Sequence, residues 1–264
     1  MTQVREGLRP LRPDWLSVGL VVSVASVVGI VFLAGLAWLP SVMGLPPAIA
    51  DPPPVWLLVF FIALAALSDV VYVPVRHGDA WEELTFVEVV VIWGVLILPP
   101  FAAMATALCG FAIVGLILRR PPVKSLFNLA AYAVSGAGLM FVYYGLFGGT
   151  GQFSLRSVLA LIAGALVFTA INLFLLSLVL LAAEDVPPRE VLAEQWGLSV
   201  GMAVGSVGVA TVALAIEQTN PVLAPFAALP VVALWYAYRA SSAHAQARER
   251  SRWLVELGQA VATP

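Results

Sequence analysis

Residues 15–39 read WLSVGLVVSVASVVGIVFLAGLAWL, an uninterrupted apolar run without a charged side chain. A membrane-spanning helix needs about 20 mostly apolar residues, so this run is long enough to cross a bilayer. A cleaved signal peptide has a shorter apolar core of about 7–15 residues. We therefore interpret residues 15–39 as a retained first membrane span, although basic residues precede it.

The composition of the whole chain agrees with this interpretation. Of its 264 residues, 61% are hydrophobic and only 11% are charged, whereas about 25% of the residues in a soluble domain are charged. A soluble globular protein is therefore excluded. The net charge of −2 provides no basic field for nucleic acid, and the single cysteine, Cys109, excludes disulfides and thiolate metal clusters.

The remaining apolar runs predict an all-α, polytopic membrane bundle of about eight helices. They are separated by proline, glycine and charged residues, and Pro99-Pro100 divides two of them into a tight hairpin because proline interrupts a helix. The predicted spans are residues 15–39, 55–73, 84–98, 101–118, 125–147, 155–183, 198–217 and 222–240.

Basic residues set the predicted orientation, because cytoplasmic segments carry an excess of Arg and Lys. Eight spans with a cytoplasmic N-terminus leave only Arg156 on the outer side, and a seven-span alternative breaks this asymmetry. We therefore expect a multi-pass plasma (inner) membrane protein with both termini in the cytoplasm. The predicted inner segments hold Arg5, Arg9, Arg12, Arg76, Arg119, Arg120, Lys124, Arg189, Arg239, Arg248, Arg250 and Arg252.

Two regions follow from this division of the chain. Residues 1–240 form the predicted transmembrane bundle, and residues 241–264 continue the last span without a helix breaker as a cytoplasmic juxtamembrane helix. Leu254, Leu257 and Val261 give this helix a thin apolar stripe. Two interpretations stay open, an amphipathic helix on the membrane surface and a stalk that joins or pairs with another domain.

Charged residues within or beside the apolar runs are the main candidate functional residues, because burying charge in a membrane is costly. The predicted topology places them at the same depth, near the inner ends of the spans. They either staple helix ends at the headgroup level or form a ligand site or switch. We expect Glu88 to contact Lys124, Asn128 or Arg120. The full set is Asp69, Glu88, Arg119, Arg120, Lys124 and Asn128.

Thr169 and Asn172 form a second, uncharged polar feature near the middle of the span at residues 155–183. Hydroxyl and amide side chains inside a membrane commonly form hydrogen bonds between helices. The two residues therefore either hold helices together or line a polar cavity.

Small residues recur every fourth position on the span at residues 198–217. Gly197, Gly201 and Gly205, with Gly208 one turn further, form a repeated small-xxx-small stripe that lets another helix approach closely. We expect the stripe to pack within the bundle, with homodimerisation as the alternative.

The sequence contains no constellation of catalytic residues. His77 and His244 lack the spacing of metal ligands relative to another His, Cys or acid. No phosphate-binding loop, nucleophile elbow or zinc-protease motif occurs. We therefore expect no enzymatic activity, no cofactor and no metal.

Four short motifs resemble the polytopic, membrane-associated (MASE-like) sensor regions of bacterial cyclic-di-GMP signalling proteins. In that family a GGDEF, EAL or HD-GYP output domain usually follows in the cytoplasm. The chain contains none of the residues for cyclase or phosphodiesterase activity, so the resemblance implies an input module alone. The motifs are residues 84–88 (LTFVE), 119–128 (RRPPVKSLFN), 220–221 (NP) with Pro230, and 237–240 (AYRA) leading into 254–258 (LVELG).

These observations favour a membrane-embedded sensory module that passes a ligand or membrane signal through residues 241–264 to a cytoplasmic output domain or partner. Besides the lipid bilayer, its expected partner is a small hydrophobic or polar ligand in the bundle. A small-solute transporter or substrate-binding membrane subunit is the alternative. The predicted cytoplasmic helix favours the sensor, because a carrier does not need such a lever.

Overall fold

Seven α-helices follow one another in the part of the chain that the computed structural model describes, residues 15–42, 52–77, 80–146 and 154–219. They correspond to the first seven predicted spans. The eighth predicted span, residues 222–240, and the predicted helix at 241–264 lie outside the described residues. The helices are α1 (Trp15–Val42), α3 (Val55–Val70), α4 (Val87–Ile97), α5 (Pro100–Ile117), α6 (Pro122–Met140), α7 (Leu155–Glu184) and α8 (Pro188–Thr219), with a π-helical turn η1 (Phe141–Leu146) continuing α6.

Five of these helices are long and apolar enough to cross a membrane. They are α1, α5, α6 with η1, α7 and α8, whereas α3 and α4 are shorter. Large apolar side chains also cover the outside of the bundle, such as Leu16, Leu20 and Ile30 along α1. An apolar outer surface of this extent is stable in lipid and not in water. The chain is therefore a membrane protein with a helical architecture.

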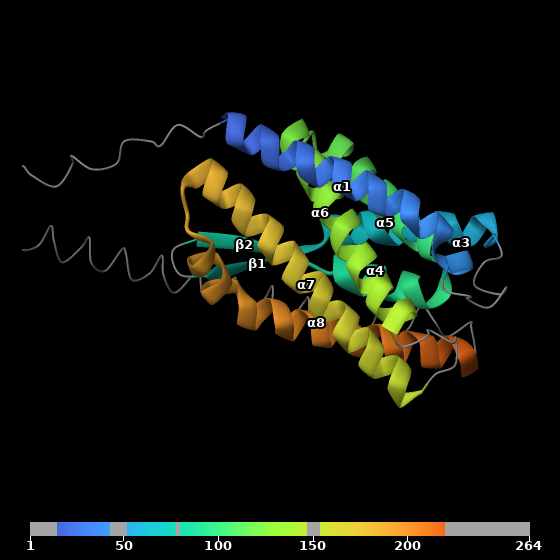
Figure 1. Ribbon diagram of the computed structural model, residues 1–264. Coiled ribbons are helices and arrows are strands. Elements are labelled where there is room, and N and C mark those ends of the chain that lie inside the picture. The colour runs from blue at the N-terminus through green and yellow to red at the C-terminus, as the bar shows by residue number, and fades with distance from the viewer. Residues whose placement is uncertain (1–14, 43–51, 78–79, 147–153, 220–264) are drawn as a thin grey trace, which may run out of the picture.

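A β-hairpin interrupts the helical pattern between α3 and α4 (Figure 1). Strands β1 (Tyr72–His77) and β2 (Ala80–Thr85) pair in antiparallel fashion, from Tyr72 opposite Thr85 to His77 opposite Ala80. The predicted helical architecture is confirmed, with this hairpin as a local departure: the predicted span at 55–73 ends inside β1, and the predicted span at 84–98 begins inside β2. The pairing satisfies backbone groups that a loop would leave to solvent.

The predicted helical hairpin around Pro99-Pro100 is present, between α4 and α5. Proline has no backbone N–H, so the Val95 carbonyl lacks the usual helical donor four residues later. The hydroxyl of Tyr144, on η1, donates to this carbonyl over 2.6 Å. This hydrogen bond holds the end of α4 against η1, the continuation of α6.

Close helix packing depends on glycines other than the predicted ones. A Cβ placed on Gly110 of α5 would lie 2.7 Å from the Ile62 carbonyl oxygen of α3, and one on Gly164 of α7 would lie 3.0 Å from the Leu139 carbonyl oxygen of α6. The backbones approach closely at both crossings, where only glycine fits. These two glycines set the positions of α3 and α7.

No described helix packs on the α8 glycine stripe, and its predicted packing stays a prediction because the predicted span at 222–240 lies outside the described residues. No described atom lies within 4 Å of a Cβ built on Gly197, Gly201 or Gly205. Instead α8 turns its alanine-containing face, with Ala203 and Ala210, inward against α4 and α7. The helix is rotated this way because larger apolar side chains such as Val207 bury more surface than glycine.

Candidate functional site

One ion pair of the predicted polar cluster forms at the junction of α3 and α5. Arg120 donates from its Nη1 atom to Oδ2 of Asp69 over 2.7 Å. Asp69 lies in the last turn of α3, and its side chain is only 11% exposed, compared with 21% for Arg120. Both charges are thus largely removed from solvent, and their pairing offsets the cost of burial.

The end of α5 places Arg120 in position for this pair. Arg119 has a left-handed backbone, with φ of 50°. The Arg120 N–H donates to the Gly115 carbonyl over 3.0 Å, and the Arg119 N–H donates to the Leu116 carbonyl over 3.2 Å. These two bonds form a Schellman-type helix end, which turns the chain sharply. The turn carries Arg120 back toward α3.

The other basic and amide members of the predicted cluster lie at or near the protein surface. Arg119 and Lys124 are exposed, and Asn128 is half-buried on α6. The structure therefore reduces the predicted cluster, within the residues it describes, to the single pair of Asp69 and Arg120.

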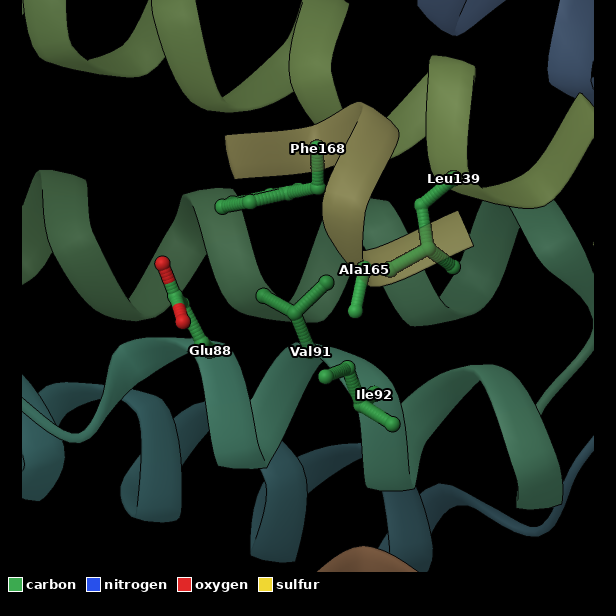
Figure 2. Close-up of a pocket in the computed structure, with 6 residues that line it drawn as sticks. All are labelled: Glu88, Val91, Ile92, Leu139, Ala165 and Phe168. Atoms are coloured by element: carbon green, nitrogen blue, oxygen red, sulfur yellow. The ribbon is translucent and has the colours of Figure 1, made fainter. Parts of the chain in front are cut away.

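Glu88 does not join that pair, and the predicted contact with Lys124, Asn128 or Arg120 was wrong. Its Oε2 atom is buried without a hydrogen-bond partner in the described part of the chain. It lines instead a narrow pocket between α4, α6 and α7 (Figure 2). The other lining residues are Val91, Ile92, Leu139, Ala165 and Phe168.

The position of this pocket along the helices explains the difference. Leu139 lies 15 residues beyond Lys124 on α6, or about 22 Å along a helix axis. Phe168 lies near the centre of α7, which spans Leu155–Glu184. Glu88, in the first turn of α4, therefore lies beside the centre of α7 and not beside the first turn of α6 that carries Lys124.

Two buried hydroxyl groups lie on the helices that face Glu88. Ser135 is on the same face of α6 as Leu139, one turn away, and Thr169 is on the same face of α7 as Ala165. The two residues are 0% and 2% exposed, and neither hydroxyl has a hydrogen-bond partner among the described residues. Among the described residues Thr169 therefore makes no interhelical hydrogen bond, which was one of the two roles predicted for it, and Asn172 is half-buried.

Aromatic rings close the pocket on one side. The ring of Phe168 lies 6.0 Å from that of Tyr132, which in turn lies 4.9 Å from the ring of Phe111. This stack joins α7, α6 and α5. The sequence pattern did not single out Ser135 or the aromatic stack. A serine or phenylalanine within an apolar helix gives no indication in the sequence of which residues its side chain contacts.

The chemistry of this arrangement is that of a carboxyl group in apolar surroundings with two hydroxyl groups nearby. No cluster of three His, Cys, Asp or Glu side chains suited to a metal occurs among the residues that the structure describes. Comparisons with known proteins give no further guide, because no protein-family model, curated protein or solved structure matches this chain.

Proposed function

We propose that the protein is a membrane-embedded sensory module that converts a change inside its bundle into movement of a C-terminal cytoplasmic helix. The observation that carries this proposal is the half-buried Glu88, whose Oε2 atom is buried without a hydrogen-bond partner among the described residues, in the pocket between α4, α6 and α7. Purely structural polar groups inside proteins are nearly always paired. An unpaired carboxyl group where three helices meet is suited to respond when it gains or loses a charge or a hydrogen-bond partner.

The physical requirement for such a sensor is modest. Two packings of the bundle must differ by only a few kcal/mol, so that a local change shifts their populations. A carboxyl group that gains or loses a charge or a partner supplies free energy of this size. The pocket joins α4 to α6 and α7, so a response at Glu88 acts on the relative position of these helices.

The arrangement of the helix ends supports the proposed orientation. The first residues of α1, the β-hairpin and the α7–α8 turn lie at one end of the bundle (Figure 1). Arg189 follows the α7–α8 turn, whereas Arg156 begins α7 at the opposite end. Because inner segments are rich in Arg and Lys, we place the hairpin end in the cytoplasm of a bacterial cell.

The proposed output follows from the resemblance to sensor regions of cyclic-di-GMP signalling proteins. The helix predicted at residues 241–264 would then connect the bundle to a cytoplasmic output domain. This role requires only that the last span and this helix move together.

A reporter fusion tests the proposal. Residues 1–264 are joined to a diguanylate cyclase domain, and cyclic-di-GMP is measured in cells that express equal amounts of each variant. We expect Glu88→Gln to change the output about fivefold or more, the usual range of allosteric coupling. The matched control is Glu190→Gln, which removes an exposed carboxyl from the first turn of α8 and should leave the output unchanged.

Two results would contradict the sensory role. One is an output that Glu88→Gln and Glu190→Gln both leave at the wild-type level. The other is solute uptake into proteoliposomes that depends on Glu88 while the reporter output stays constant, which would favour the transporter.

A further inference from the structure

The pocket between α4, α6 and α7 contains a single ionisable group. Figure 2 shows the Glu88 carboxyl extending from α4 toward the helix that carries Phe168. The five other lining side chains are apolar, and Oε2 has no hydrogen-bond partner in the described residues. An ionised carboxylate without a partner is far more costly in such surroundings than the neutral acid.

The size of the pocket restricts what Glu88 can bind. The space between the lining side chains is too narrow to hold a water molecule. Hard cations such as Mg²⁺ and Ca²⁺ require six or more oxygen ligands, whereas the lining offers one carboxyl group. A proton is the ligand that this space admits.

No charge on the surrounding helices is positioned to neutralise a Glu88 carboxylate in the part of the chain that the structure describes. On α3, Asp69 is paired with Arg120. On η1, the Tyr144 hydroxyl donates to Val95, and the neighbouring Tyr143 is buried. Tyr132 of α6 lies in the aromatic stack with Phe168. The exposed groups are Cys109 on α5, Lys124 on α6, Arg156 and Glu184 on α7, and Arg189 and Glu190 on α8.

We propose that Glu88 is a proton-binding site that is occupied at neutral pH, and that loss of the proton changes the packing of α4 on α6 and α7. Once ionised, the carboxylate requires hydrogen-bond donors. The unpartnered hydroxyls of Ser135 and Thr169, each one helical turn from a residue that lines the pocket, are candidate donors on the facing helices. The signalling consequence rests on the proposed sensory function, whereas the proton site itself does not.

Infrared spectroscopy of the purified chain in lipid nanodiscs tests the proton site directly. An exposed glutamate, with a pKa of about 4.3, is almost fully ionised at pH 7. We expect wild-type protein at pH 7 to show a protonated-carboxyl C=O band that shifts when glutamate is labelled with ¹³C. Glu88→Gln should abolish the band, and Glu190→Gln should retain it.

A second variant keeps this experiment decisive if Glu88→Gln folds poorly. Glu88→Asp should retain a protonated-carboxyl band that no longer shifts on ¹³C-glutamate labelling. A wild-type protein without a labelled band at pH 7, or a labelled band that survives in either Glu88 variant, would overturn the proton site. A confirmed band together with an unresponsive reporter fusion would instead refute the sensory function alone.

The role of the hydroxyl groups has its own test. If Thr169 stabilises the carboxylate, Thr169→Val should move the loss of the band to higher pH by about one unit. Thr106→Val is the matched control, because the Thr106 hydroxyl already donates within its own helix to Ala102 over 2.8 Å. An unchanged midpoint in both Thr169→Val and Ser135→Ala would overturn the proposed hydrogen bonds.

Discussion

A single hydroxyl shows how individual residues hold this bundle together. Tyr144 supplies the hydrogen bond that Pro99 cannot give to the Val95 carbonyl. Tyr144→Phe keeps the ring and leaves a buried carbonyl unpaired, which costs about 1–3 kcal/mol. We expect a corresponding loss of stability in unfolding measured in detergent. A variant as stable as the wild type would show that this carbonyl has another partner.

The ion pair of Asp69 and Arg120 makes a second prediction at the residue scale. Its partial exposure places it between surface pairs, worth about 0–1 kcal/mol, and fully buried pairs, whose disruption costs about 3–5 kcal/mol. We therefore expect Asp69→Asn and Arg120→Gln each to destabilise the protein by roughly 1–3 kcal/mol. The double variant should lose less than the sum of the two. Additive losses in the same unfolding measurement would contradict a direct interaction.

The contrast between Asp69 and Glu88 shows how far single residues could be predicted. Asp69 and Arg120 were correctly placed at the same depth, because both lie next to helix ends that proline and charge mark in the sequence. The contact predicted for Glu88 was wrong, because α4 directs this side chain into the pocket between α6 and α7 and not toward the α5–α6 connection. Hairpin β1–β2 takes up the residues before α4. Because Tyr72 at the start of β1 pairs with Thr85 at the end of β2, the hairpin returns the chain to its starting level, and the sequence could not show which way the Glu88 side chain would turn.

At the scale of elements, the glycines explain which helix contacts resist substitution. Gly110 has no room for a Cβ against α3, whereas Gly201 has no described atom within 4 Å. Gly110→Ala should therefore destabilise the bundle by about 1–3 kcal/mol through overpacking. Gly201→Ala should be neutral or slightly stabilising, because alanine favours a helix. Equal effects of the two substitutions on detergent unfolding would contradict this assignment of helix faces.

The same comparison shows what the sequence could not provide about the elements. The apolar runs and Pro99-Pro100 predicted where each helix lies in the sequence. They did not predict how each helix is rotated about its axis, and so which face it turns into the bundle. The stripe at Gly197, Gly201 and Gly205 is more regular in sequence than the isolated Gly110 and Gly164, yet among the described helices Gly110 and Gly164 lie at close crossings and the stripe does not. The hairpin had a usable signal in Gly78-Asp79, a two-residue turn pair flanked by strand-forming residues such as Val75.

For the whole molecule, the proposed orientation predicts which ends react from each side of the membrane. In a background with Cys109→Ala, Arg156→Cys should react with an impermeant thiol reagent applied to intact cells. Arg189→Cys should react only after the membrane is opened, because the α7–α8 turn lies at the proposed cytoplasmic end. The reverse pattern of labelling would contradict the orientation.

The Glu88 side chain lies between α4, α6 and α7, whereas Lys124 at the start of α6 lies on the surface. Thiol accessibility in nanodiscs open on both faces tests this difference most directly, again with Cys109→Ala. Lys124 is exposed, so Lys124→Cys should react rapidly with a charged thiol reagent, whereas Glu88→Cys should react only after unfolding. Labelling of Glu88→Cys as fast as that of Lys124→Cys would contradict the position of Glu88 between α4, α6 and α7.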